Sequence, residues 1–233
     1  MFPLKDTVTA RSTPVVNYLI IGTNVAFFIL AASLGDRGFL HLVRGLGVIP
    51  NRFLSSFGPA QLGTVFTSMF LHGGWFHLLS NMWALYIFGD NTEDRMGSAR
   101  YLLFYLISGA VAALVHILVA SGSTVPVVGA SGAISGVMGA YILLFPTSRI
   151  ITLVPIFFLP WLVEIPALVF IGMWFLSQLF SGILSLAADA VGAYGGVAWW
   201  AHVGGFLIGL ILAKLFARKD YRRLYPHDLH WFR

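Results

Sequence analysis

The chain has 233 residues, of which 58% are hydrophobic and only 10% are charged. Soluble domains carry about a quarter charged residues, so this composition excludes an ordinary soluble domain and favours a polytopic helical membrane protein. There is no cysteine, which excludes disulfides, zinc–thiolate sites and cysteine nucleophiles. The net charge is +5, and many of the basic residues lie at or beyond the end of the last apolar run, between Lys214 and Arg233. That position indicates an anchor on anionic lipid, and we expect no nucleic-acid partner.

Six apolar runs predict an all-α, six-helix membrane bundle. Their expected ranges are 16–34, 66–88, 101–120, 130–145, 167–184 and 197–216. One membrane domain over residues 16–216 then lies between an N-terminal tail of residues 1–15 and a basic C-terminal tail of residues 217–233. The first tail lacks the apolar core of a signal peptide, so we expect the first run to remain as a span.

Two segments between the runs break the apolar pattern. The charged stretch "GDNTEDRMGSAR", residues 89–100, predicts a turn between the second and third spans. The apolar stretch "IITLVPIFFLPWLVEIP", residues 150–166, contains three prolines, which disfavour a long helix. We interpret it as an interfacial segment, and Glu164 as an interfacial carboxylate within it.

The basic residues predict the orientation of the bundle. Lys5 and Arg11 precede the first run, and the basic tail follows the last, so both termini are expected to be cytoplasmic. Three arginines in the long loop after the first run oppose this assignment mildly, since it places them outside. We expect a multi-pass protein of the plasma or inner cell membrane.

Three of the runs carry polar residues that lipid disfavours. His77 and Asn81 lie early in the second run, Ser131 opens the fourth, and His202 lies near the start of the sixth. With the expected orientation, all three runs enter from outside, so these groups reach a similar depth in the outer half of the bilayer. His77 and Asn81 are four residues apart and share one helix face.

Small residues recur at intervals of four in the fourth and sixth runs, a pattern that lets two membrane helices pack closely. The members are Gly132 and Gly136 in the fourth run, and Ala201, Gly205 and Gly209 in the sixth. Packing of these two stripes against each other would place the hydroxyl of Ser131 beside the imidazole of His202.

A serine beside a histidine indicates nucleophilic catalysis. The imidazole of His202 can act as general base for Ser131. No Asp or Glu lies near His202 in the sequence, so we expect a Ser–His dyad rather than a triad. The side chains of His77 and Asn81 are candidate donors to an oxyanion. A metal site at His72, His77 and His202 is the competing interpretation, but it lacks the H-E-x-x-H pattern of zinc hydrolases. We expect no metal and no other cofactor. Taken singly, each polar group also fits a structural hydrogen bond between helices.

At these residues the sequence resembles the rhomboid family of intramembrane serine proteases. Three motifs carry the resemblance: "HGGWFHLLSNM" at residues 72–82, "GASG" at residues 129–132 and "AHVGG" at residues 201–205. Their order on the second, fourth and sixth of six runs is far more specific than any one of them. The resemblance extends over residues 14–216, nearly the whole chain.

The resemblance implies a role for each motif. Ser131 is implied as the nucleophile and His202 as the general base. His77 and Asn81 are implied to form the oxyanion hole, together with backbone N–H groups at Gly129 and Ser131. The implied reaction is hydrolysis of a peptide bond in or near a transmembrane segment of a membrane-protein substrate, within a lipid bilayer.

The resemblance also predicts some structural features. The fourth helix is expected to be short, with a water-filled cavity above the serine, and the first loop to lie partly in the membrane. The fifth span is a candidate substrate gate, and "GAYGG", residues 192–196, a mobile cap. Two features depart from the family pattern: Gly63 and Thr64 replace a Trp-Arg pair in the first loop, and Ser135 replaces an aromatic residue.

Two further functions remain open. A rhomboid-like protein that binds membrane segments without cutting them would share the fold, but such proteins usually lack the serine or the histidine. A small transporter would be expected to show internal repeats and a polar path through the bilayer. The sequence indicates no oligomeric state and no particular substrate.

Overall fold

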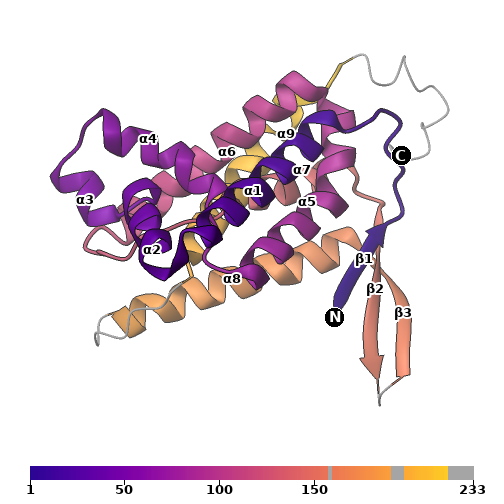
Figure 1. The fold of residues 1–233 in the computed structure, drawn as a ribbon. Helices are drawn as coiled ribbons and strands as arrows, with labels where there is room; N and C mark the ends of the chain where they lie inside the picture. The colour runs from indigo at the N-terminus through magenta and orange to yellow at the C-terminus, as the bar shows by residue number, and fades with distance from the viewer. Residues whose placement is uncertain (157–158, 190–196, 220–233) are drawn as a thin grey trace.

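The computed structural model describes residues 1–156, 159–189 and 197–219, which form a helical bundle with a small sheet at one edge (Figure 1). The helices are α1 (Val15–Ser33), α2 (Gly35–Leu46), α3 (Pro50–Ser55), α4 (Pro59–Thr67), the 3-10 turn η1 (Ser68–Phe70), α5 (Trp75–Met96), α6 (Ser98–Val119), α7 (Ser131–Leu144), α8 (Ala167–Asp189) and α9 (Trp199–Phe216). The expected cap at residues 192–196 and most of the C-terminal tail lie outside the described residues.

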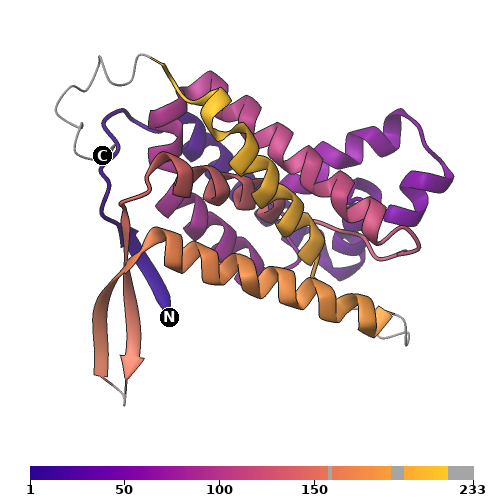
Figure 2. The same cartoon turned by 180° about the vertical axis from the view of Figure 1, so that it is seen from behind.

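The short helix α7 lies at the centre of the bundle. Its residues are nearly all buried, and it packs against α9, α6 and α5. Figure 2 shows α9, in yellow, running between α6 and α8. The 14 residues of α7 span only about 21 Å, less than the hydrocarbon thickness of a bilayer. The predicted short fourth helix is therefore present, enclosed by longer neighbours.

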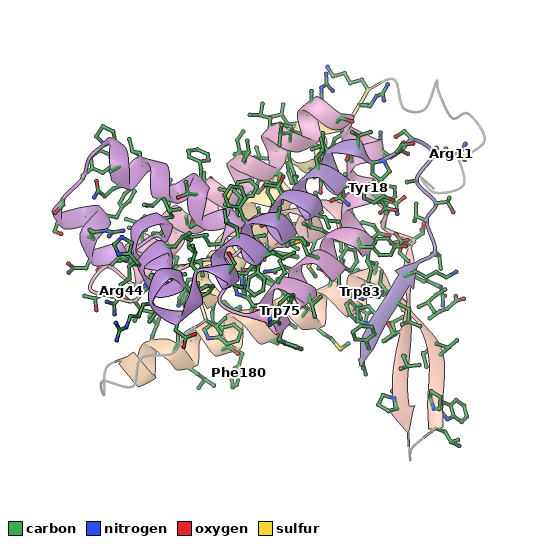
Figure 3. All side chains as sticks on the ribbon, in the orientation of Figure 1. Arg11, Tyr18, Arg44, Trp75, Trp83 and Phe180 are labelled. Carbon is green, nitrogen blue, oxygen red and sulfur yellow. The ribbon has the colours of Figure 1, made fainter. Side chains whose placement is uncertain are left out.

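Within the described residues, four helices are long and apolar enough to cross a membrane, judged by length and composition: α1, α6, α8 and α9. Together with their exposed apolar side chains they make this a multi-pass membrane protein. Figure 3 shows one such side chain, Phe180, on the outer surface of α8. The remaining two expected spans correspond to α5 and α7, which do not meet the same criteria.

The expected second span was placed about eight residues too early. Phe66 belongs to α4, the chain turns at η1, and α5 begins only at Trp75 and continues to Met96. Most of the stretch predicted as a charged turn is thus the last part of a helix. Two of its acidic residues, Glu93 and Asp94, are buried and have hydrogen-bond partners. The Glu93 carboxylate accepts bonds from the backbone N–H groups of Val16 (3.1 Å) and Asn17 (2.7 Å). Glu93 therefore stabilises the start of α1, a long-range role that the local charge pattern conceals.

The all-α expectation is wrong at one edge of the molecule, although the fold is mostly helical. Strands β1 (Phe2–Asp6), β2 (Arg149–Ile156) and β3 (Leu159–Pro166) form an antiparallel sheet in the order β1-β2-β3. The proline-containing stretch is therefore a hairpin, in which Pro155 is paired with Pro160 near the tip. Proline breaks a helix but is tolerated at strand ends and edges, and the β-branched residues around Ile150 favour a strand. Glu164 is exposed on β3.

Candidate active site

Ser131 and His202, which the sequence places 71 residues apart, meet in the interior of the bundle. The Oγ atom of Ser131 lies 2.7 Å from Nε2 of His202, within hydrogen-bond distance. Ser131 is the first residue of α7, and His202 lies in the first turn of α9. The structure thus brings together the two residues that the sequence suggested as nucleophile and base.

Glycines allow the close approach of α7 and α9 that this contact requires. A Cβ atom added to Gly205 would lie 2.0 Å from the carbonyl oxygen of Gly132, and one added to Gly209 would lie 2.1 Å from that of Gly136. Any side chain at Gly205 or Gly209 would therefore push the helices apart. Ala201, the fifth member of the small-residue set, is buried at the same interface. The two stripes pack against each other.

The backbone just before Ser131 is held in a conformation that only glycine adopts readily. Gly129 has a φ of +133°, and its N–H donates to the Ser68 carbonyl at 2.9 Å. A Cβ at Gly129 would lie 2.7 Å from Cε1 and 2.8 Å from Nε2 of His77. Gly129 therefore leaves open the space between the His77 ring and the serine. Its own N–H, expected as an oxyanion donor, is instead already bonded to the Ser68 carbonyl.

His77 presents a nitrogen to this space. The other nitrogen, Nδ1, accepts a long hydrogen bond of 3.4 Å from the backbone N–H of Gly73. In neutral imidazole one nitrogen donates and the other accepts, so this bond leaves the proton on Nε2. Nε2 lies, together with Cε1, against Gly129. His77 can thus donate a hydrogen bond into the space beside Ser131.

Asn81 lies one helical turn after His77 on α5 and lines the same cavity. Its side chain is buried, yet its amide nitrogen Nδ2 has no hydrogen-bond partner among the described residues. An unpaired buried N–H is costly, which makes it available for an acceptor that arrives with a substrate.

His72 packs edge-on against His77, with ring centroids 5.1 Å apart. It is buried, and neither of its ring nitrogens bonds to another described residue. No group of three or more His, Cys, Asp or Glu side chains within the described part of the chain is placed to hold a metal ion. The structure thus offers no cluster that fits the metal interpretation of the histidines.

A cavity of about 1530 Å³ is lined by Ser131, His77, His202 and Asn81. Apolar side chains from α5, α7 and α8 form much of its remaining wall, among them Trp83, Met138, Phe170 and Trp174. The cavity is largely apolar and has a few convergent polar groups, which is the character of a binding or active site.

Gln178 is the polar residue of the site that the sequence analysis missed. It lies on α8, is 7% exposed, and its Oε1 atom is 2.7 Å from Nδ1 of His202. The available signal was a single amide in an otherwise apolar run. Ser135, which replaces the family's aromatic residue, bonds instead to the backbone carbonyl of Ser131 at 2.6 Å.

Two tryptophans lie beside the His202 ring. The ring centroids of Trp174 and Trp199 are 6.0 and 6.2 Å from that of His202. Trp174 comes from α8 and Trp199 from α9, and they give the imidazole the aromatic neighbours that Ser135 cannot supply.

The first loop contacts the serine segment through its backbone. Val48 and Val127 exchange two hydrogen bonds, of 3.0 and 2.7 Å. The hydroxyl of Thr64, which stands where the family's Trp-Arg pair would fall, bonds within its own helix to the Gln61 carbonyl at 2.6 Å. In this chain the loop is therefore tied to the segment before Ser131 without that pair.

The Rhomboid domain family model matches residues 59–219, which cover most of the chain and include every residue of this site. The chain belongs to the rhomboid family. It is 28% identical over 234 residues to the mitochondrial Rhomboid protein 1 of Saccharomyces cerevisiae, covering 92% of this chain and 58% of the relative. It is 31% identical over 200 residues to the chloroplastic Rhomboid-like protein 11 of Arabidopsis thaliana, covering 84% and 66%.

A bacterial relative is named as a protease. The Rhomboid protease GluP of Bacillus subtilis is 31% identical over 139 residues, which cover 58% of this chain and 26% of the relative. The chain thus spans about a quarter to two thirds of the length of these three relatives. Two of the three names are organellar, so they do not support the plasma membrane expected from the sequence.

Proposed function

We propose that this rhomboid-family protein is an intramembrane serine endopeptidase that cleaves transmembrane protein substrates. The observation that carries the proposal is the 2.7 Å contact between Ser131 Oγ and His202 Nε2 inside a cavity with unpaired donors. A hydroxyl within hydrogen-bond reach of an imidazole is the arrangement that activates a serine nucleophile. The name of the relative GluP is consistent with this chemistry.

The reaction follows from the positions of these groups. As Ser131 Oγ attacks the carbonyl carbon of the scissile peptide bond, its proton passes to Nε2 of His202. The resulting imidazolium then gives that proton to the leaving amine nitrogen, which releases one fragment and leaves an ester on Ser131. A water molecule gives a proton to His202 and attacks the ester, and the proton returns to Ser131 Oγ as the second fragment leaves.

The negative charge of each tetrahedral intermediate needs donors that are already in place. Nε2–H of His77 and Nδ2–H of Asn81 supply two of them from α5. The backbone N–H of Ser131, at the start of α7, supplies a third. Gly129 keeps the space for the oxyanion open because it has no side chain.

In the membrane, six helices would cross or enter the bilayer: α1, α5, α6, α7, α8 and α9. The proposed arrangement places both termini on the cytoplasmic side and Ser131 in the outer half of the bilayer, reached by water from outside. In Figure 3 Arg11 lies at one end of the bundle and Arg44 at the opposite end, so basic residues lie at both ends. A plasma or inner membrane remains our proposal for the location.

Cleavage of a reconstituted single-span substrate tests the proposal. Wild-type protein in liposomes should release a fragment, whereas Ser131→Ala and His202→Ala should release none while retaining their thermal stability. Equal cleavage by wild type and Ser131→Ala would overturn the assignment. A substrate that binds to wild type and is never cut would instead favour a membrane-segment binding protein without activity.

A further inference from the structure

The imidazole of His202 has a partner on each side. Nε2 faces Ser131 on α7, and Nδ1 lies 2.7 Å from Oε1 of Gln178 on α8. We propose that Gln178 is a positioning residue that fixes the tautomer and the orientation of the catalytic base, so that the site is a Ser–His–Gln arrangement. This inference rests on the proposed function and goes beyond it by assigning a third residue to the site.

The hydrogen bonds of α8 decide which end of the Gln178 amide faces the histidine. The hydroxyl of Ser177 donates to the Trp174 carbonyl at 2.6 Å, so its oxygen is left as an acceptor. The Gln178 side-chain nitrogen Nε2 donates to that oxygen at 3.0 Å. The amide nitrogen is thereby directed to Ser177, and the amide oxygen Oε1 remains to face His202.

The orientation of the amide in turn sets the proton position on the imidazole. Because Oε1 of Gln178 can only accept, Nδ1 of His202 carries the hydrogen, and Nε2 of the neutral ring is free to accept from Ser131. That is the tautomer needed by a general base. The bonds run in one direction, from the Ser131 hydroxyl through His202, Gln178 and Ser177 to a backbone carbonyl of α8. Bonds aligned in this way polarise one another.

A neutral amide suits this location better than a carboxylate. A charged carboxylate at membrane depth is costly, and the Gln178 side chain is almost completely buried. An amide oxygen still accepts from Nδ1–H and stabilises the imidazolium formed during the reaction through a charge-assisted bond. The amide therefore supplies orientation without a buried charge, as the asparagine of papain-like proteases does for its histidine.

Two substitutions separate positioning from packing. Gln178→Met has nearly the same length but no acceptor, and Gln178→Glu keeps an acceptor and adds a charge. The matched control is Leu176→Met, because Leu176 lies on the same helix but is exposed on its outer surface. Each purified variant is treated with a fluorophosphonate probe, and the labelling rate at Ser131 is measured from pH 5 to 9 together with thermal stability.

We expect Gln178→Met to fold with wild-type stability or nearly so. The probe should label it about ten- to a hundredfold more slowly, because one hydrogen bond to the imidazolium of His202 is lost. Gln178→Glu should recover much of the rate at alkaline pH. Its acid limb should move about one unit or more to higher pH, because a nearby carboxylate favours the imidazolium. His77 and His116 line the cavity in every variant, so the comparison between variants isolates position 178. Equal labelling of Gln178→Met and Leu176→Met would overturn the inference.

A second measurement does not depend on activity. In Ser131→Ala protein with ¹⁵N-labelled histidine, the His202 resonances report which ring nitrogen carries the proton. We expect Nδ1–H, and a shift toward Nε2–H when Gln178→Met is added. If the fluorophosphonate probe never labels the wild-type protein, the proposed function fails. The tautomer change would still support the proposal that Gln178 positions the His202 ring. An unchanged tautomer would overturn it.

Discussion

Gly205 and Gly132 are in such close contact that a methyl group at position 205 would lie 2.0 Å from the carbonyl oxygen of Gly132. Because that oxygen belongs to the backbone of α7, it cannot move without moving the helix. Gly132 directly follows Ser131, and Gly205 lies about one turn after His202, so the spacing of α7 and α9 at these glycines sets the distance between the Ser131 and His202 side chains.

Gly205→Ala should therefore damage both stability and the site. Overpacking of this kind typically costs about 1–3 kcal/mol, and we expect a lower unfolding temperature together with slower probe labelling of Ser131. The control is Gly22→Ala on α1, where a Cβ would meet no atom within 4 Å. Alanine favours helix over glycine, so the control should be as stable as wild type or slightly more so. Two variants of equal stability would contradict the proposed packing.

Gly129→Ala should affect catalysis more than folding. The new methyl group would contact the His77 ring and occupy the space beside Ser131, and the φ of +133° would be strained. Blocking one oxyanion donor should lower kcat by about 100- to 1000-fold. Gly74→Ala, where a Cβ would meet nothing within 4 Å, is the control for an added methyl group near the same histidine. A Gly129→Ala protein with wild-type kcat would show that the oxyanion lies elsewhere.

Asn81→Ala should lower kcat/KM by about 100- to 1000-fold while leaving thermal stability nearly unchanged. The Asn81 Nδ2 atom has no partner among the described residues, so its removal breaks no bond that stabilises the fold there. Ser80→Ala is the neighbouring control, since among the described residues the Ser80 hydroxyl bonds only to the His77 carbonyl of its own helix, at 3.1 Å. A large loss of stability in Asn81→Ala would instead indicate a structural role.

Asp6, which lies near the end of α7 opposite to Ser131, should make the stability of the fold depend on pH. Its Oδ2 atom accepts hydrogen bonds from the Tyr141 hydroxyl and, at 2.9 Å, from Asn91. Burial raises the pKa of Asp6 from 3.8 to about 7, opposed in part by the Tyr141 bond and assisted by the nearby Asp90 carboxylate. Between those two values the folded protein holds a proton that the unfolded chain has lost, so the stabilisation is complete below pH 3.8 and is lost as pH rises through about 7.

Asp6→Asn removes this titration and keeps an oxygen acceptor. Measured by thermal unfolding in detergent from pH 5 to pH 8, wild type should lose stability relative to Asp6→Asn as the pH rises. Subtracting the two curves removes the other titrating groups, which are common to both proteins. A difference that stays constant over this range would show that Asp6 does not titrate there.

The sequence was sufficient to suggest the two proposed catalytic residues because each lies in a short motif and beside a stripe of small residues. Ser131 and His202 follow from "GASG" and "AHVGG", and the stripes at Gly132 and Gly205 indicate which helices touch. Neither inference requires knowledge of long-range polar contacts. The 2.7 Å contact between Ser131 and His202 is therefore the part of the site that local sequence patterns predict best.

Features that depend on distant partners were not predictable in the same way. Glu93 looks like part of a charged turn until its bonds to the start of α1 are known. Gln178 is one amide in an apolar helix, and its partner His202 is 24 residues away. The hairpin of β2 and β3 was missed because its strands are apolar on both faces, which conceals the alternation of a half-buried strand.

The measurement that tests the central claim most directly is fluorophosphonate labelling of the purified protein, with the modified residue located by mass spectrometry. If His202 activates Ser131, wild-type protein should be labelled at Ser131, and His202→Ala should not be labelled detectably under the same conditions. Equal labelling of Ser131 with and without the imidazole, or labelling of a different serine in the wild-type protein, would contradict the proposed Ser131–His202 mechanism.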